Sequence, residues 1–322
     1  MNLIATQKAV VISIFVVLAG CQAVPTSKTI IENPTVSIIN HSLTAQMPTI
    51  DRQGHIAFVE EQGSGRDKVS SLYSISPDGS NRQLIDQIKG YIYAPAWSAD
   101  GELLAYSKQA VRQHPKIYIY APSTRTRRLI VNAEGSNLSA SFSPDGEKLL
   151  YSSTVGGNAD IYEMQLRNGN ARQLTTLTST EVQPSYAPDG NSFVYVSDKV
   201  RAGRPSVYRY VFATGRAERI SDGGYAASPQ LSLDGQRLAY LNDRQAAVMT
   251  LATGQIINLA ETGLDEPARL SPSGQYAVYP TAISIVNGQR RGGLVIHSFD
   301  GNPNYTISSK NGGVMRSPVW SR

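Results

Sequence analysis

Hydrophobic and polar residues alternate along most of this chain in short runs that end at turn residues. Runs such as Ile56-Ala57-Phe58 and Leu104-Ala105-Tyr106 place large apolar side chains at every second position, which is the period of a half-buried β-strand. Gly, Pro, Asn and Asp separate these runs and favour turns. No helical period of useful length accompanies them. The pattern therefore predicts an all-β fold built from short strands.

The strand pattern repeats about every 45 residues. Asp-Gly turns at Gly101, Gly146, Gly190 and Gly235 are spaced by 45, 44 and 45 residues. Gly54 marks an earlier copy, and Ser273-Gly274 a degenerate later one. Because the Asp-Gly pair accepts positive φ, it suits a tight hairpin between two antiparallel strands. A period of this length is typical of a repeat architecture.

Each repeat contains four strand-like runs in a fixed order. An apolar anchor comes before the turn, an aromatic strand follows it, and a third strand with an Ile-Tyr or Val-Tyr pair precedes a fourth that carries Arg. Examples of the four are Phe142, Tyr151, Ile161-Tyr162 and Arg172-Gln173-Leu174. Four strands in each of six units predict a six-bladed β-propeller, in which stacked blades bury both faces of every sheet.

The end of the chain repeats the beginning of a unit. Pro318-Val-Trp320-Ser321 has the form of Pro95-Ala-Trp97-Ser98. No clean first strand precedes Gly54, so we expect this C-terminal strand to complete the N-terminal blade and close the ring.

The N-terminal segment has the features of a secretory signal. Ala9 to Ala19 is an apolar run broken only by Ser13, and its length of about 16 Å as a helix is too short to span a bilayer. Leu18-Ala19-Gly20-Cys21 resembles the bacterial lipobox, in which the Cys sulfur is acylated and the chain is cut before it. This resemblance implies a signal peptide at 1–20 and lipidation at Cys21. An unmodified buried thiol is the alternative.

The residues that follow Cys21 predict a tether and favour one of the two bacterial membranes as the site of attachment. Gln22 is not the Asp that retains many lipoproteins in the inner membrane, so outer-membrane placement is favoured. Residues 21–45 show no sustained period apart from a short strand at Thr35 to Ile39, and we interpret them as a lipidated tether. The propeller is expected over 46–322.

Composition narrows the classes of function. One Cys in 322 residues excludes an intrachain disulfide framework and a multi-Cys zinc site. The net charge of +5, or +4 once residues 1–20 and their single Lys are removed, is too small to indicate a nucleic-acid binder. A monomer is expected.

Candidate chemistry is sparse. The four His residues share no metal-ligand spacing, and there is no phosphate-binding Gly loop or nucleophile elbow. We assign the Asp of the Asp-Gly turns to hydrogen bonding within the turn, and Tyr106, Tyr151, Tyr195 and Tyr240 to the core. The sequence therefore predicts no catalytic residues, no metal and no cofactor.

The repeat motifs resemble one family. Ser139-Ala-Ser-Phe-Ser-Pro-Asp-Gly146, Gln183-Pro-Ser-Tyr-Ala-Pro-Asp-Gly190 and Ala171-Arg-Gln-Leu-Thr175 look like the repeats of the TolB propeller, over residues 46 to 322. The resemblance implies a non-enzymatic envelope protein that binds the peptidoglycan-associated lipoprotein, Pal, within the Tol-Pal system and supports outer-membrane integrity. Similar repeats also occur beside peptidases and in surface proteins, so the fold follows from them more firmly than the function.

The chain also departs from that family. TolB is a soluble periplasmic protein with an α/β domain before its propeller, whereas here we expect a tether and a lipid anchor. The segment through which TolB contacts TolA then has no evident counterpart, which leaves that coupling in doubt.

Strand order predicts which loops bind. The connections from strand four to the next strand one, and from strand two to strand three, share one face, and the Asp-Gly turns lie on the other. The partner-binding residues expected on the first face are Tyr93, Glu181, Tyr225, Glu266, Arg316, Arg201 and Arg204. Further basic residues there, including Arg112, His114, Arg290 and Arg291, suggest a basic rim for an acidic partner or an anionic polymer. An ordinary solvated face explains these charges equally well.

Two other functions stay open. One is an enzyme acting on cell-wall or polysaccharide material at the channel mouth, which the lack of clustered His and paired acids disfavours. The other is a carbohydrate-binding or assembly scaffold, which the sequence does not separate from a protein-binding propeller.

Overall fold

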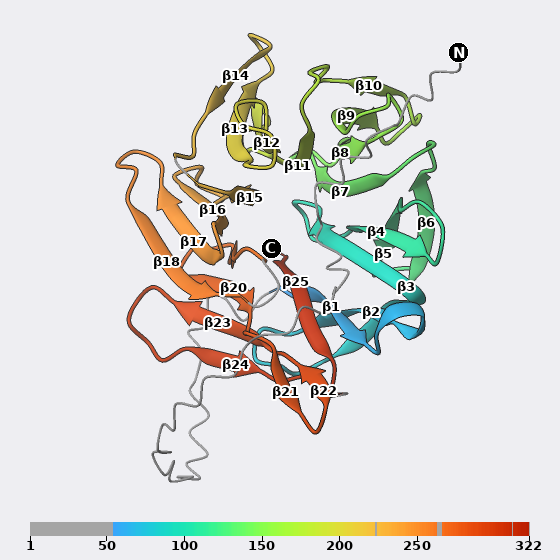
Figure 1. Cartoon of the computed structure of the whole chain (residues 1–322), viewed down its shortest axis with the longest axis vertical. Helices are drawn as coiled ribbons and strands as arrows, with labels where there is room; N and C mark the ends of the chain where they lie inside the picture. The colour runs from blue at the N-terminus through green and yellow to red at the C-terminus, as the bar shows by residue number, and fades with distance from the viewer. Residues whose placement is uncertain (1–53, 223, 263–265, 311, 322) are drawn as a thin grey trace, which may run out of the picture.

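The strands form a ring of blades around a central axis (Figure 1). The computed structural model describes residues 54–321 except 223, 263–265 and 311. Within them, the strands make six four-stranded antiparallel blades, and a single 3-10 turn, η2 (Gly65–Asp67), is the helical element. The prediction of an all-β, six-bladed propeller is confirmed. The signal peptide, Cys21 and the tether with its Thr35 to Ile39 strand lie outside the described residues.

The first two blades share one long strand. Blade I contains β25 (Val314–Trp320), β1 (Ile56–Gln62), β2 (Val69–Ile75) and the first part of β3 (Gln83–Trp97). Blade II contains the second part of β3, then β4 (Leu104–Ala110), β5 (Lys116–Ala121) and β6 (Thr126–Val131).

The remaining blades are separate sheets. Blade III contains β7 (Asn137–Phe142), β8 (Lys148–Ser153), β9 (Asp160–Gln165) and β10 (Ala171–Gln173). Blade IV contains β11 (Glu181–Tyr186), β12 (Ser192–Ser197), β13 (Ser206–Val211) and β14 (Arg216–Arg219). Blade V contains β15 (Ala226–Leu231), β16 (Arg237–Asn242), β17 (Gln245–Thr250) and β18 (Ile256–Glu261). Blade VI contains β19 (Arg269–Leu270), β20 (Tyr276–Pro280), β23 (Leu294–Ser298) and β24 (Tyr305–Ile307), with an inserted hairpin of β21 (Ser284–Val286) and β22 (Gln289–Arg291).

The C-terminal strand closes the ring as the sequence predicts. β25 pairs with β1 in antiparallel register, with Ile56 opposite Trp320 and Glu61 opposite Val314. In Figure 1 the two ends of the colour scale meet in this blade. Blade I is therefore assembled from both ends of the propeller, and closure leaves no open edge between the first and last blades.

The hydrophobic core consists of six clusters, one at each contact between neighbouring blades. The second strand of a blade serves two of them. Leu104 and Tyr106 pack toward blade I, while Ala105 between them packs toward blade III. Period-two strands that bury both faces follow from this stacking. Tyr106, Tyr151, Tyr195 and Tyr240 are between 0% and 4% exposed, which confirms their assignment to the core.

The Asp-Gly turns form the face opposite the binding loops, which we call the turn face. At Asp145, the Ser143 hydroxyl and the Glu147 amide both donate hydrogen bonds to Oδ1, and Gly146 has φ +72°. The hydroxyl bond, followed by the amide bond, lowers the pKa of Asp145. These contacts confirm a structural role for the repeated Asp.

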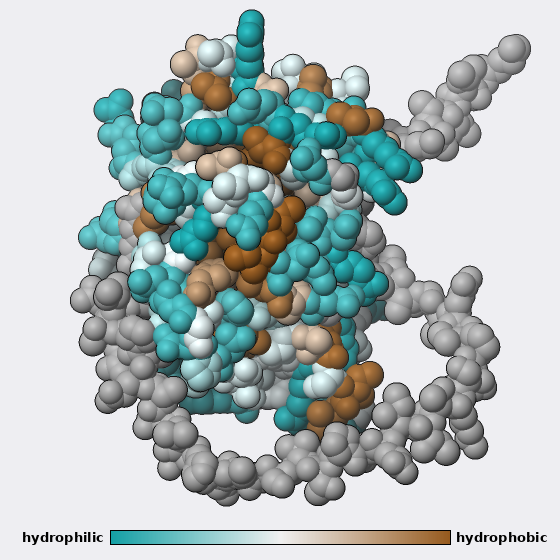
Figure 2. All heavy atoms as spheres, turned by 90° about the vertical axis from the view of Figure 1, so that its left-hand side faces the viewer, coloured by the Kyte–Doolittle hydropathy of each residue, from teal (hydrophilic) through white to brown (hydrophobic). Residues whose placement is uncertain are grey.

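The outer wall of the ring is formed by the fourth strands. Figure 2 shows the side that carries β18, where a mainly hydrophilic surface is interrupted by an apolar patch. Ile256 and Ile257 of β18 contribute exposed apolar area on the outer wall. No helix among the described residues has the length and apolar character needed to cross a membrane.

Candidate functional site: the channel mouth and its rim

The innermost strands of all six blades line a central cavity of about 260 Å³. Five of them contain a non-glycine residue with φ between 44° and 57°, and all five ladders show a register shift at that residue. These residues are Ala94, Ser139, Gln183, Ser228 and Ser317. Such left-handed residues cost free energy and persist where the surrounding structure fixes them. Here they set the shape of the channel wall.

The cavity lining reaches both faces of the ring: Pro144, Pro188 and Leu233 belong to the Asp-Gly turns, whereas Tyr225 and Glu266 belong to the connections from strand four to strand one, which share their face with the connections from strand two to strand three. We call this shared face the mouth face. Hydrogen bonds between blades join the two kinds of connection: the amide of Glu181 donates to Ala159 O at 2.8 Å, and that of Ala226 to Pro205 O at 2.9 Å. The two sets of loops therefore form one continuous surface, as the strand order predicts.

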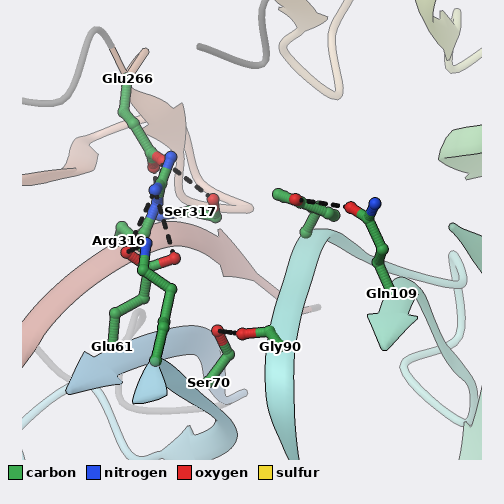
Figure 3. Close-up of polar contacts among 9 residues, drawn as sticks. Glu61, Ser70, Gly90, Gln109, Glu266, Arg316 and Ser317 are labelled. Atoms are coloured by element: carbon green, nitrogen blue, oxygen red, sulfur yellow. Dashed lines mark hydrogen bonds and ion pairs between the residues drawn. The ribbon is translucent and has the colours of Figure 1, made fainter. Parts of the chain in front are cut away.

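Arg316 is the centre of an ion-pair cluster at the mouth (Figure 3). Its Nε donates a 2.8 Å hydrogen bond to Glu266 Oε1, and its Nη1 lies 3.3 Å from Glu61 Oε2. Lys68 pairs with the same Glu61 carboxylate at 2.9 Å. Ser317 donates to Glu266 from both its amide and its hydroxyl. Two cations and two carboxylates thus balance one another and join β25, β1 and the start of blade VI.

Burial and charge set the protonation of this cluster. Burial acts to raise the pKa of Glu61, but Arg316 and Lys68 outweigh it and hold that pKa below its usual value. The two carboxylates likewise outweigh the burial of Arg316 and raise the pKa of its guanidinium. Glu61 and Arg316 are therefore both charged at neutral pH.

Glu181 lies behind the mouth, in a second buried group. It is 0% exposed and accepts hydrogen bonds from the Ser179 and Ser197 hydroxyls. Asp160 is 1% exposed and electrostatically coupled to it, and each carboxyl has one oxygen without a hydrogen-bond partner. Burial raises the pKa of both carboxyls, and the Asp160 charge raises that of Glu181 further.

The other expected binding residues differ in how far they reach the surface. Tyr93 is buried, and its hydroxyl donates to Gln109 Oε1 at 2.9 Å. Tyr225 is partly exposed, and Arg201 and Arg204 are exposed. Glu266 is 6% exposed. Tyr93, Tyr225, Glu266 and Arg316 therefore line the cavity, Glu181 is fully buried without lining it, and the two arginines are exposed on their loop.

Charge separates the two faces of the ring. The six connections between strands two and three hold nine Lys or Arg and three Asp, a net charge of 9 − 3 = +6, at 63–68, 111–115, 154–159, 198–205, 243–244 and 281–293. The connections from strand four to strand one hold one Lys and four acids, a net charge of 1 − 4 = −3. The five turns between strands one and two carry six acids and no Lys or Arg. The positive charge thus forms an outer ring around the mouth.

Comparison with known proteins identifies the family. The profile of the TolB beta propeller domain matches residues 43–322. The Tol-Pal system protein TolB of Bordetella pertussis is 32% identical to this chain over 271 residues, which is 82% of the chain. The chain belongs to the TolB beta propeller family. It spans 59% of the length of that Bordetella relative.

Solved structures support the TolB-like fold. The crystal structure of TolB from Acinetobacter baumannii superimposes with a TM-score of 0.74 at 32% identity, over 84% of this chain and 67% of that one. A chain of the nidogen/laminin complex gives a TM-score of 0.60 at 9% identity over 83% of this chain and 98% of that one, a likeness of fold alone.

Sequence reasoning missed three features of this TolB-like mouth: the Asp160 to Glu181 pairing, the Glu61 and Lys68 members of the ion-pair cluster, and Arg269 in the channel. Arg269 stands in the degenerate unit whose turn is Ser273-Gly274. Comparing its position with the other innermost strands would have revealed it. Among the described residues, no three His, Cys, Asp or Glu side chains are grouped to hold a metal ion.

Proposed function

We propose that this TolB-like propeller is a non-enzymatic envelope protein that binds a Pal-like lipoprotein through its mouth face, in a Tol-Pal-like system that supports outer-membrane integrity. The observation that carries the proposal is the mouth face itself, where a cavity lined by all six blades opens inside a ring of basic loops. The relatives named Tol-Pal system protein TolB supply the class of partner.

We assign the contacts to the residues that reach solvent. Tyr225 offers a partly exposed ring at the mouth, and Arg201 and Arg204 offer exposed positive charge on the loop before β13. Tyr93, Glu181, Glu266 and Arg316 hold the shape of the surface on which these residues stand. Complementary charge at a rim speeds association and orients the partner.

Apolar side chains at the tips of the same loops favour a protein partner. Val111, Val200 and Ile285 are 44%, 69% and 75% exposed, on loops that also carry arginines. Exposed aliphatic groups on a polar rim mark interaction surfaces, because their burial in a complex removes apolar area from water. A polysaccharide ligand would make less use of such groups.

We further propose that Cys21 is acylated and attaches the protein to the outer membrane as a monomer. His55, the residue that leads into β1, is bonded to Ser321 on the turn face. A tether that enters there leaves the mouth face directed away from the attachment point and open to a partner.

Capture from crosslinked bacterial envelopes tests the proposal. The full chain carrying Arg201→Glu and Arg204→Glu should recover at least about tenfold less Pal-like lipoprotein than the unmodified chain. Arg125→Glu with Arg167→Glu is the matched control, since both residues are exposed on turns between strands three and four. Equal recovery by the two double variants, or recovery of glycan fragments alone, would contradict the proposal.

A further inference from the structure

One position on each innermost strand contributes to the channel wall just before the apolar anchor. In five blades it holds a small or uncharged residue, and in blade VI it holds Arg269. The equivalent residues are Ala96, Ser141, Ser185, Gln230 and Val319, all of which line the cavity. Arg269 thus places one full positive charge at a level where the other blades contribute none.

The contacts of Arg269 leave that charge without a counterion. Its Nη1 donates to two backbone carbonyls, Ser228 O at 2.9 Å and Ala268 O at 3.3 Å. No carboxylate of the described residues lies within ion-pair distance, in contrast to Arg316, which pairs with Glu61 and Glu266. Carbonyl dipoles stabilise a guanidinium less than a carboxylate does.

The remaining donors of Arg269 are open to a ligand. Its Nε and Nη2 make no hydrogen bond to any described residue, and neither is among the buried atoms that lack a partner, so both remain accessible. Burial lowers the pKa of the guanidinium to about 10, with Glu266 opposing the shift, so the group stays charged at neutral pH. A partly desolvated cation with two free donors is suited to a planar anion.

The rest of the wall indicates which anion. Three charged residues of the described part of the chain line the cavity. Glu266 and Arg316 form an ion pair with each other, so Arg269 determines the sign of the net charge there. Proline and aromatic side chains make up much of the surface, including Pro229, Pro318 and Trp320. Such a wall packs against the apolar part of a peptide better than against a hydrated inorganic ion.

We propose that the central cavity is a carboxylate-binding site, in which the Nε and Nη2 groups of Arg269 bind a carboxylate carried by a peptide segment. Its role in capturing a partner rests on the function proposed above, but the site is defined by the chain's own residues. Either a C-terminal carboxylate or an Asp or Glu side chain supplies the group.

The chain carries its own reporter for this site. It has two tryptophans, Trp97 and Trp320, and both line the cavity. Tryptophan emission of the full chain can therefore be followed while three peptides are added at constant ionic strength: N-acetyl-trialanine with a free carboxylate, the same peptide as its amide, and N-acetyl-Ala-Asp-Ala-amide.

We expect the free acid to change the emission in a saturable way, with an affinity at least about tenfold higher than that of the neutral amide. Arg269→Gln should remove this preference, and Arg269→Lys should restore part of it. Arg125→Gln, which neutralises an exposed arginine on the turn between β5 and β6 and outside the cavity lining, should leave it unchanged. A response to the aspartate peptide shows that a side-chain carboxylate is also accepted.

Two results would overturn the site: equal affinity for acid and amide in the unmodified chain, or an unchanged preference in Arg269→Gln. If Arg269→Gln does not fold, the acid and amide peptides compared on the unmodified chain and on Arg269→Lys decide the question. Envelope capture is a separate readout. Peptide binding without lipoprotein capture contradicts the proposed partner alone, and capture without acid preference contradicts the carboxylate site alone.

Discussion

His55 and Ser321 are 266 residues apart in the chain and hydrogen-bonded to each other. The His55 amide donates to Ser321 Oγ at 2.7 Å, and the Ser321 amide donates to His55 O at 2.8 Å. These bonds end the pairing of β25 with β1, so the first blade exists only when the last seven-residue strand is in place. Ring closure therefore links the stability of the whole propeller to its C-terminus.

Removing that strand should prevent cooperative folding. A chain that ends after Gly313 loses Val314–Trp320 and exposes the edge of β1, so we expect a broad, early unfolding transition by circular dichroism and association by size-exclusion chromatography. Trp320→Ala is a smaller change, confined to the hydrophobic cluster between blades VI and I. It should lower the free energy of unfolding, measured in urea, by about 3–5 kcal/mol. A control lacking only Arg322 should behave as the full chain. An unchanged midpoint after the longer truncation would show that closure is dispensable.

Arg316→Met tests the ion-pair cluster. The change leaves Glu61 and Glu266 buried with one cation fewer, so we expect a loss of about 3–5 kcal/mol in the free energy of unfolding. Arg219→Met is the control, because its partner Asp222 is fully exposed and the pair lies at 3.8 Å, so its removal should cost little.

The same variant has a predicted pH signature. The pKa of Glu61 is lowered from 4.5 in the folded state, so its contribution is present above that value and is lost as pH falls through the lower folded pKa. The unmodified chain should lose this stability in acid, and Arg316→Met should lose much less. Parallel stability curves for the two chains across acidic pH would contradict the assignment.

Glu181→Gln tests the buried carboxyl pair of Asp160 and Glu181. The pH dependence of stability expected from this pair is opposite in sign to that expected from Glu61. The pKa values of Asp160 and Glu181 are raised in the folded state, so their contribution is present below the unfolded values and is lost as pH rises toward the folded ones. The amide keeps the acceptor used by Ser179 and Ser197 and removes one charge. We expect Glu181→Gln to be more stable than the unmodified chain at neutral pH. Its stability should also fall less as pH rises. Glu218→Gln, on an exposed strand, should change neither quantity.

Cys21→Ala tests the anchor. With radiolabelled fatty acid supplied to an expressing bacterium, the unmodified chain should be labelled and should sediment with outer membranes. The variant should lose the label because the acylated sulfur is gone. Label that persists in Cys21→Ala would show that lipid is attached elsewhere.

The repeated part of this fold could be predicted from sequence because each blade repeats the same pattern of residues. Phe142, Tyr151 and the Asp145-Gly146 turn have counterparts in neighbouring units, so strand order, ring closure and the buried tyrosines followed from one period. What could not be predicted depends on single units. The continuous β3 and the β21 to β22 hairpin depart from the four-strand repeat. Each occurs in one place only, so comparison of the units does not predict it.

The site was predicted only in part for a related reason. Strand order placed Glu181 and Glu266 on the mouth face, but a carboxylate's burial depends on which side chains of other blades reach it. Arg316 reaches Glu266 across 50 residues, and Asp160 lies beside Glu181 from the preceding blade. Such pairs are set by the closed ring and leave no mark in the local pattern.

The proposed function depends most directly on which face of the ring meets the partner. A photo-reactive phenylalanine analogue can be placed at Tyr225 on the mouth face or at Asn191, an exposed residue of an Asp-Gly turn on the opposite face. After irradiation of intact cells, the Tyr225 position should form a crosslink to a Pal-like lipoprotein and the Asn191 position should form none. A crosslink to that lipoprotein from Asn191, with none from Tyr225, would contradict partner binding at the mouth face.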